Sequence, residues 1–457
     1  MTRSQPVYEA TKAYVIAALR YLEEHHGPGP TSVLEWEHWV RTEPRQFVRQ
    51  HFLEERWSPI YGRIDEEIHS LLEYGECLAA MRGDGVIGRH LETLVGTVVG
   101  AHRVELHAIP DGILSRLATE VRGWDFDEAR FDALYGEYES ALFAESFTYN
   151  LVVPLPGLTS DGLPIDLGEQ AVVDTMTEEE ALACVRSGLF QPMGGDWPII
   201  SVASETALRL TVSLPKVVGE PRPEARDQEV AALFDRFKDV AERTVLALRL
   251  SSSSRIVAPG YIYYANEWPL RGAISFAPLG SSPRRTMWAT AYEVDAEAVA
   301  AFRESWGQLA SEGVRRQREL GVALRRFSDA GDRDRDDDAL IDLMIAAEAM
   351  FLPNVRDELK YRLALRAAFF IAAEMGLSRR EVFSHMKRAY DARSVLAHGG
   401  VLADLKLADG THVALGEFVR VTTDHLRTAL RKGVRLASES AEARPLVDWD
   451  NLTLGEA

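Results

Sequence analysis

Arg393 and His398 are the residues of this chain whose types and spacing are best suited to chemistry. A guanidinium group can hold a phosphate through two parallel hydrogen bonds. An imidazole can transfer a proton near neutral pH. Gly399 and Gly400 follow the histidine directly and are expected to end the helix that carries the pair. Together these residues suggest chemistry on an RNA backbone.

The spacing itself is weak evidence, because four of the twelve histidines follow an arginine at this distance. The three other pairs are Arg20/His25, Arg380/His385 and Arg420/His425. Only Arg393/His398 has Tyr390 and an aspartate before it, a small polar residue after the arginine, and two glycines after the histidine. This setting selects it as the candidate catalytic pair.

In the expected reaction, the 2′-hydroxyl of RNA is the nucleophile and His398 gives a proton to the leaving 5′-oxygen. Arg393 neutralises phosphate charge in the transition state, and Ser394 can donate a further hydrogen bond. This chemistry requires no metal or cofactor, and the sequence predicts neither. The alternative is an ordinary amphipathic helix that buries Tyr390 and its apolar neighbours and leaves the arginine on the surface.

Helix geometry bears on how the pair can act. Five residues turn through about 500° and rise about 7.5 Å, so Arg393 and His398 lie roughly 140° apart around the helix. The angle can relax if His398 lies in a frayed last turn. Alternatively, a two-fold axis can bring two copies of the helix to one cleft, which makes a homodimer a natural arrangement.

Glu348 and Arg366 lie on the apolar stripes of the two preceding helices, where a charged side chain is expected to have a partner. One interpretation is a structural Glu348–Arg366 ion pair that fixes the helix register. The other is that Glu348 orients Arg393. The sequence leaves both open.

Composition is ordinary for a globular chain of 457 residues, with 46% hydrophobic and 26% charged residues. The net charge of −19 argues against a protein that coats nucleic acid. Residues 338–432 carry 14 Lys+Arg against 12 Asp+Glu, about +2, which leaves −21 for the rest. A near-neutral segment at 338–432 in an otherwise acidic chain suits an enzyme that contacts a few phosphates. The acidic charge of the other residues is explained equally well as a surface that keeps the protein in solution.

Other motifs in the sequence are weaker evidence for a function. Residues 83–88 match the dinucleotide pattern G-x-G-x-x-G, but a helical pattern precedes them where that site needs a strand. Cys77 and Cys184 form no metal-ligand pattern, and they fit a reducing cytoplasm without a structural disulfide. No apolar run reaches the ~18 residues of a membrane span, so no membrane partner is expected.

The expected fold class is a multidomain α+β protein, with a mixed α/β N-terminal region followed by an all-α bundle. Residues 1–147 are expected to be mostly helical, with helices at 11–24, 60–81, 90–109 and 126–143. Residues 148–328 are expected to be mixed α+β. The expected strands there are 149–155, 208–214, 255–264, 273–277 and 286–294, and the expected helices are 177–187, 228–249 and 296–327.

The charged segment 329–338 has no apolar face and is expected to be a solvated linker at a domain boundary. Residues 339–440 are expected to form a helical bundle with helices at 338–352, 355–376, 378–398 and 414–438, followed by a C-terminal tail at 441–457. Gly376 and Ser378 are the expected stop and cap between the second and third of these helices.

The last hundred residues resemble the Apea-like HEPN domain of the HEPN superfamily. The residues that carry the resemblance are Tyr390-Asp391-Ala392-Arg393-Ser394 through His398-Gly399, Ala347-Glu348-Ala349-Met350-Phe351 and Tyr361 to Ala368. The match covers about 335–440. The family's polar residue after the arginine is usually Asn, Asp or His, and Ser394 is a milder version.

The resemblance implies a helical bundle, often dimeric, whose catalytic members are metal-independent endoribonucleases. Several members act in antiphage defence or as toxins. The family's arginine and histidine correspond to Arg393 and His398. The leading hypothesis is therefore an RNA-cleaving effector whose N-terminal part senses a trigger or holds the nuclease inactive. An unknown trigger or an antitoxin is a possible partner. The alternative is a non-catalytic HEPN protein that dimerises or binds a nucleotide.

Overall fold

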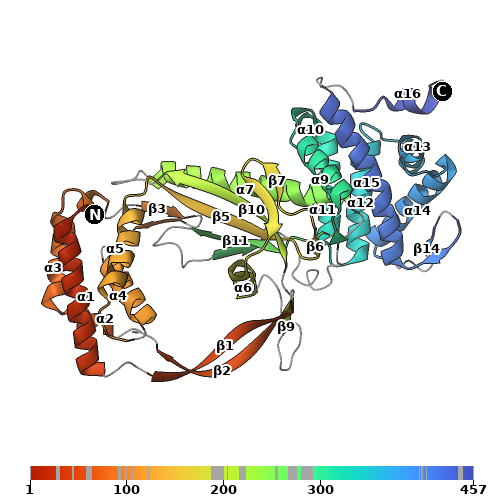
Figure 1. Cartoon of the computed structure of the whole chain (residues 1–457). Coiled ribbons are helices and arrows are strands. Elements are labelled where there is room, and N and C mark those ends of the chain that lie inside the picture. Colours follow the sequence, from red (N-terminus) through yellow and green to blue (C-terminus); the bar gives the residue numbers. More distant parts are fainter. Residues whose placement is uncertain are drawn as a thin grey trace.

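The structure is a computed structural model, and it arranges the chain as three parts in a row (Figure 1). Helices near the N-terminus lie at one end, a sheet with a long helix along it lies in the middle, and a helical bundle lies at the other end. The structure describes residues 2–26, 31–43, 46–57, 64–90, 94–97, 100–103, 107–121, 123–186, 200–202, 204–215, 223–252, 256–265, 275–278, 292–400, 402, 405–407, 409–440 and 446–455.

The N-terminal part is largely helical, as the sequence predicts. Its helices are α1 (Gln5–His26), α2 (Ile64–His69), α3 (Leu72–Gly83), α4 (Ala108–Val121) and α5 (Glu128–Leu142). Their facing sides bury a shared core that includes Tyr14, Leu22, Ile113 and Phe131. Hydrophobic burial therefore holds this part together.

Two segments of the N-terminal part differ from the prediction. β1 (Thr31–Glu43) and β2 (Gln46–Trp57) form a long antiparallel hairpin, which β9 (Ile200–Val202) joins. The helix expected at 90–109 is wrong, because β3 (Leu94–Thr97) and β4 (Gly100–Arg103) pair there as antiparallel strands. The first segment is rich in β-branched and aromatic residues, which favour a strand, and the second contains valines and threonines that favour a strand and glycines that disfavour a helix.

The middle part is built on a six-stranded antiparallel sheet. Its strand order is β12 (Ser275–Pro278), β11 (Gly260–Ala265), β5 (Ser146–Pro154), β10 (Thr206–Pro215), β8 (Ala171–Thr175) and β7 (Ile165–Gly168). A separate parallel pair joins β6 (Leu158–Thr159) to β13 (Tyr292–Glu293). Most of the last strand expected in this region, 286–291, lies outside the described residues.

Side-chain alternation along the strands decides which helix covers each face. Leu208 and Leu210 belong to the main core, together with residues of α7 (Pro223–Ser251). Val152, Ala207 and Ile262 form a second cluster with α6 (Glu178–Arg186). Figure 1 shows α6 and α7 on opposite sides of the sheet. The period of two seen in the sequence of β10 therefore separates two apolar layers.

A capping box starts α6. The Thr177 amide donates to the Glu180 carboxylate at 2.9 Å, and the Glu180 amide donates to the Thr177 hydroxyl at 3.1 Å. Glu180 is buried, and Arg209 of β10 pairs with it at 2.8 Å. This buried carboxylate therefore fixes α6 to the sheet as well as capping the helix.

The segment expected as one helix, 296–327, forms α9 (Ala296–Leu309), α10 (Glu312–Arg316) and α11 (Arg318–Asp332). The Ser311 hydroxyl accepts a hydrogen bond from the Val314 amide and starts a new helix at α10. The chain thus turns twice before the bundle.

The expected linker at 329–338 is wrong. α11 continues to Asp332 and α12 (Asp336–Phe351) begins four residues later, so only 333–335 connect them. Ala330 is buried, and the carboxylate of Asp342 pairs with Arg326 at 3.1 Å and with Arg333 at 2.6 Å. The charged side chains that suggested a solvated segment are therefore partly neutralised by ion pairs that join α11 and the connection to α12.

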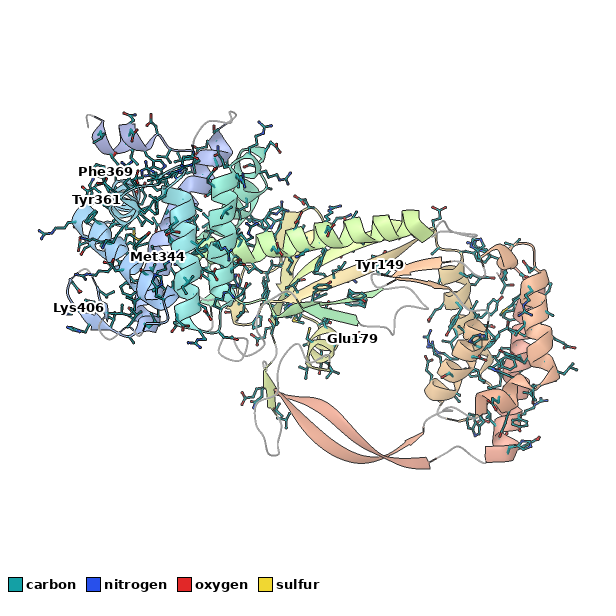
Figure 2. The ribbon with its side chains drawn as sticks, turned by 180° about the vertical axis from the view of Figure 1, so that it is seen from behind. Tyr149, Glu179, Met344, Tyr361, Phe369 and Lys406 are labelled. Carbon is teal, nitrogen blue, oxygen red and sulfur yellow. The ribbon has the colours of Figure 1, made fainter. Side chains whose placement is uncertain are left out.

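The four helices expected in the C-terminal bundle are α12, α13 (Leu359–Ile371), α14 (Arg379–Ala397) and α15 (Leu415–Glu439). Gly376 has a left-handed φ of 65°, and Ser378 forms a capping box with Glu381. The core contains Met344, which Figure 2 labels inside the bundle, and Phe418. The stop and cap signals in the sequence are thereby confirmed.

Two features of the bundle have no counterpart in the sequence prediction. A short hairpin of β14 (Leu405–Lys406) and β15 (His412–Val413) connects α14 to α15. Within the expected C-terminal tail, α16 (Trp449–Leu454) buries Trp449 against the rings of Phe351 and Phe370, with centroid distances of 5.7 and 5.5 Å. This segment of the tail is therefore part of the bundle core.

Candidate functional site

Helix α14 carries the candidate pair, and its end is sharply defined. His398 is the C-terminal cap, with φ −96° and ψ 12°. The Gly399 amide donates to the Leu396 carbonyl and the Gly400 amide to the Val395 carbonyl, both at 2.9 Å. These two bonds form a Schellman motif, so His398 leaves the helix at its last turn.

Each glycine after His398 has its own role in this turn. Gly399 has a left-handed φ of 74°, a conformation that an L side chain rarely adopts. A Cβ on Gly400 would lie 2.7 Å from a methyl carbon of Val395 and 3.0 Å from its carbonyl oxygen. Both glycines are therefore required to end the helix at this position.

Arg393 faces α12, where its nearest charged partner is Glu348. The distance from Arg393 Nη2 to Glu348 Oε2 is 3.7 Å, and each side chain is 28% exposed. This contact is loose for an ion pair, and the buried Arg393 Nε has no hydrogen-bond partner in the described part of the chain. The guanidinium thus has an orienting carboxylate and hydrogen-bonding capacity to spare.

Arg366 contacts core residues of the bundle and not Glu348. Its Nη1 donates to the Phe351 carbonyl at 2.8 Å, and its guanidinium lies 5.3 Å from the ring centroid of Trp449. Burial lowers its pKa from the ordinary arginine value. Among the described residues it has no ion pair with Glu348, so the expected structural Glu348–Arg366 pair is wrong, and Glu348 lies beside Arg393.

The imidazole of His398 is exposed at the end of α14. Neither ring nitrogen has a partner among the residues that the structure describes. A histidine with both nitrogens open to solvent can meet a substrate or a second protein chain without breaking a structural contact.

The three other histidines with the same spacing are all engaged. His25 Nδ1 contacts the Tyr21 carbonyl at 2.8 Å, and its ring stacks on that tyrosine at 4.0 Å. His385 and His425 are buried and stack on each other at 4.5 Å. Of the four pairs with this spacing, only Arg393/His398 has a histidine whose ring forms no hydrogen bond, ion pair or ring contact with the described residues.

The buried pair is held neutral by its surroundings. His385 Nε2 lies 3.0 Å from the Thr422 hydroxyl, and His425 Nδ1 lies 2.8 Å from the Val421 carbonyl. Burial, with His425 and Arg388 nearby, lowers the pKa of His385 to about 3. Burial also lowers the pKa of His425. These two histidines are therefore core residues.

The remaining supporting residues flank the pair on α14. Tyr390 is half-buried and packs against the core, and Ser394 is half-buried. Asp391 points to α13 and pairs with Lys360 at 2.9 Å. Tyr390 and Ser394 thus lie one turn or less from Arg393, while Asp391 serves the packing of α13 and α14.

Two exposed apolar side chains, one on α13 and one on α14, were not identified from the sequence as surface residues. Tyr361 is 53% exposed and Val395 is 40% exposed, which makes them two of the five large apolar side chains exposed in the described part of the chain. Figure 2 shows Tyr361 on the side of the bundle away from the sheet. Helical spacing alone could not show that these two side chains are exposed, because an exposed and a buried apolar residue look alike in a sequence.

Arg393 and His398 have different surroundings in the folded chain. The Arg393 guanidinium lies beside Glu348 of α12, whereas His398 is the C-terminal cap of α14 and its ring forms no hydrogen bond, ion pair or ring contact with the described residues. Helix geometry places residues five apart roughly 140° apart around a helix, so the pair is expected to need either a relaxed last turn or a second copy to act on one phosphate.

Other candidate motifs form no site in the described residues. Helix α3 directly precedes the glycine-rich segment at 83–88, and Asp84 accepts hydrogen bonds from the Val86 and Ile87 amides at 2.8 Å, so the segment is a plain turn. Cys77 and Cys184 are free and buried. Within the described ranges no group of three His, Cys, Asp or Glu side chains is placed to hold a metal ion. No described helix has the length and apolar composition needed to cross a bilayer.

Comparison of the chain with protein-family models, with curated proteins and with solved structures found no significant match. The resemblance to the HEPN superfamily therefore rests on the motif residues themselves.

Proposed function

We propose that residues 339–440 form an Apea-like HEPN bundle and that the protein is a metal-independent endoribonuclease. The observation that carries the proposal is the difference among four identically spaced pairs. Only the ring of His398 has no hydrogen bond, ion pair or ring contact with the described residues, and its arginine lies beside a carboxylate of the neighbouring helix. Structural histidines in this fold are stacked or hydrogen-bonded, as His25, His385 and His425 are.

In the proposed reaction, the 2′-oxygen of a ribose attacks the adjacent phosphorus and the bond from phosphorus to the 5′-oxygen breaks. His398 gives its proton to the departing 5′-oxygen, while the 2′-hydroxyl proton passes to a second base. The products are a 2′,3′-cyclic phosphate and a 5′-hydroxyl. Arg393, oriented by Glu348, binds the non-bridging phosphate oxygens as negative charge develops on them.

The proposed active form is a homodimer. Residues five apart on a helix are expected to lie roughly 140° apart, so a second copy related by a two-fold axis would complete the cleft and supply the second histidine. The exposed Tyr361 on α13 and Val395 on α14 would suit such an interface. A role as a toxin or in antiphage defence, under control of an unknown trigger or antitoxin, is part of this proposal.

The test is cleavage of total cellular RNA by the purified full chain in the presence of EDTA. Wild type is expected to cleave and to leave 2′,3′-cyclic phosphate ends, and His398→Ala and Arg393→Ala are expected to lose activity by at least about a hundredfold, the usual contribution of a positioned acid. The matched control is His25→Ala, which removes the histidine of an identically spaced pair. Equal cleavage by wild type and His398→Ala would show that the proposal is wrong.

The alternative is a bundle that dimerises without catalysis, which the exposed apolar pair Tyr361 and Val395 also favours. It predicts a stable dimer in sedimentation velocity that cleaves no cellular RNA. Expression in cells separates the two functions as well, since the nuclease is expected to arrest growth and Arg393→Ala to relieve that arrest.

A further inference from the structure

A pocket lies far in sequence from Arg393, at the joint between the sheet and the bundle. Its volume is about 780 Å³, within the range of small-molecule sites. One wall is α7 of the sheet part, and the other walls are α9, α10 and α11. The proposed nuclease reaction uses none of the residues that line it.

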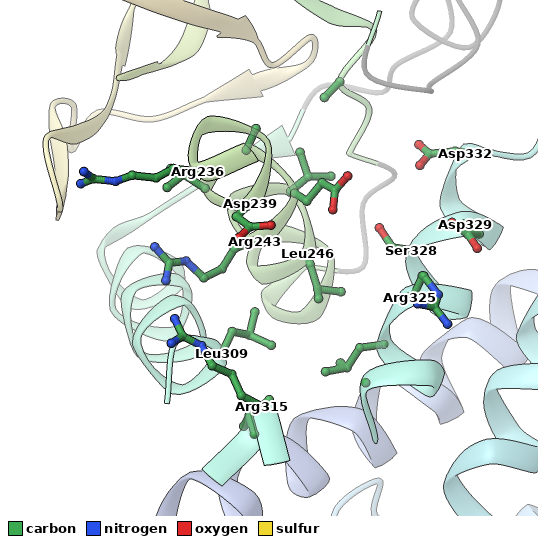
Figure 3. Close-up of a pocket in the computed structure, with 18 of the residues that line it drawn as sticks. Arg236, Asp239, Arg243, Leu246, Leu309, Arg315, Arg325, Ser328, Asp329 and Asp332 are labelled. Carbon is green, nitrogen blue, oxygen red and sulfur yellow. The ribbon is translucent and has the colours of Figure 1, made fainter. Parts of the chain in front are cut away.

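Charged side chains line both sides of this pocket, and Figure 3 shows Asp239 beside Arg243 on one side and Arg325 near Asp329 on the other. The guanidinium groups of Arg236, Arg243 and Arg315 gather on one side. The carboxylates of Asp329 and Asp332 lie on the other. Apolar side chains, Leu246 and Leu309 among them, lie between the two sides.

The carboxylates of the pocket are largely neutralised by neighbouring cations. Glu169 pairs with Arg243 at 3.1 Å, and Glu242 pairs with Lys238 at 3.7 Å. On the other side, Asp329 pairs with Arg326 at 3.7 Å, and Asp332 pairs with the buried Arg249 at 2.5 Å. Asp239 is the pocket carboxylate without an ion pair in the described residues.

Three arginines of the pocket, in contrast, have no carboxylate partner. The side chains of Arg236, Arg315 and Arg325 form no ion pair or hydrogen bond with any residue that the structure describes. The lining holds five arginines and five carboxylates, but four of the carboxylates have a cation partner while these three guanidinium groups have none. The unpaired charge available to a ligand is therefore mainly positive, which favours an anionic ligand.

Arg243 is held in place before any ligand arrives. Its guanidinium lies 3.7 Å from the ring centroid of Trp306, and the indole nitrogen of Trp306 donates to Thr244 at 3.1 Å. The Nε of Arg243 is buried without a hydrogen-bond partner. A stacked guanidinium loses little further side-chain entropy when it binds a phosphate, so this residue is suited to anchor one.

We propose that this pocket binds a nucleotide with two or more phosphates. The phosphates lie against Arg243, Arg315 and Arg236, where bidentate hydrogen bonds can form. The base lies over the apolar surface around Leu246 and Leu309. Amino or hydroxyl groups at the other end donate to the carboxylates of the opposite wall.

The experiment is isothermal titration of the full-length protein with ATP, with inorganic pyrophosphate and adenosine as separate probes. ATP is expected to bind saturably, pyrophosphate to compete with it more weakly, and adenosine alone to bind weakly or not at all. The test variant is Arg315→Ser, which removes an exposed and unpaired side chain and leaves the fold intact. It is expected to weaken ATP binding about tenfold, the effect of one charge-assisted contact.

The matched control is Arg318→Ser, since Arg318 is exposed and unpaired in the described residues but lies outside the pocket lining. Its affinity for ATP is expected to equal that of wild type. The proposal is overturned if wild type shows no saturable ATP binding, if adenosine binds as tightly as ATP, or if both variants weaken binding equally. None of these outcomes depends on RNA cleavage, so this proposal and the proposed function fail separately.

Discussion

The buried histidine pair His385 and His425 makes the bundle sensitive to acid, and the effect can be worked out from the structure. Folded His385 has a pKa of about 3, whereas the ordinary value is 6.5. As pH falls below 6.5, the unfolded chain takes up a proton at this position and the folded chain does not. The stabilisation is therefore complete above pH 6.5 and is lost as pH falls towards the folded value.

The magnitude follows from the two pKa values. Between pH 7 and pH 5 the free energy of unfolding is expected to fall by about 2 kcal/mol through His385 alone. The pKa of His425 is lowered too, which adds to the loss in the same direction. The charged groups nearest the pair are Arg388, which opposes protonation of His385, and Asp424, which favours protonation of His425.

The assay is the thermal unfolding midpoint of the full chain at pH 7 and pH 5, compared between wild type and His385→Gln. Glutamine can still bond to Thr422 and does not titrate, so the variant is expected to have a smaller difference between the two midpoints. The control is His412→Gln, because His412 is exposed on the β14–β15 hairpin. The reasoning is refuted if His385→Gln has the same pH dependence as wild type.

Three further outcomes test the site and its scaffold. Glu348→Ala is expected to reduce RNA cleavage about tenfold without unfolding the bundle, since it removes the carboxylate beside Arg393; unchanged cleavage rates would exclude an orienting role. Gly399→Val is expected to destabilise the chain by about 1–2 kcal/mol in denaturant unfolding, because valine resists a φ of 74°. It is also expected to lower cleavage by displacing His398, and full activity would argue against a defined helix end. Arg249→Ala is expected to lower the free energy of unfolding by on the order of 3 kcal/mol, because it leaves the Asp332 carboxylate without its buried partner. A change below about 1 kcal/mol in denaturant unfolding would contradict this expectation.

The joint between the sheet and the bundle connects the part of the chain that holds the proposed nucleotide pocket to the helices of the proposed nuclease. Arg249, near the end of α7, pairs with Asp332 at the end of α11, and its carbonyl accepts a hydrogen bond from Arg427 of α15 at 2.8 Å. The proposed nucleotide pocket lies directly at this joint, because Asp332 lines it. A ligand there would contact helices of both parts.

Local sequence signals were sufficient for much of the helical architecture. Gly376 and Ser378 marked a helix stop and a helix cap, and the glycines after His398 marked the end of α14. These signals are readable because their physics is local: a left-handed φ selects glycine, and a capping serine satisfies an amide in the same turn. The strand alternation around Leu208 and Leu210 was readable for the same reason.

Other segments were misjudged because their charges or apolar residues find partners far away in the chain. The segment 329–338 has the composition of a solvated linker, and only the pairing of Asp342 with Arg326 and Arg333 makes it a helical hairpin. Strands β3 and β4 need each other to form, so a window covering 90–109 favoured a helix.

For the candidate site, the sequence by itself determined the residue types, their spacing and the helix end that carries them. The tertiary structure decided which of the four identically spaced pairs is available for chemistry. His385 contacts Thr422, thirty-seven residues away along the chain, and stacks on His425, forty residues away. These contacts form only in the folded core. It also decided that Glu348 lies beside Arg393 while Arg366 lies over Trp449. The physical reason is that burial and ion pairing depend on distances between helices, and a sequence specifies only distances along the chain.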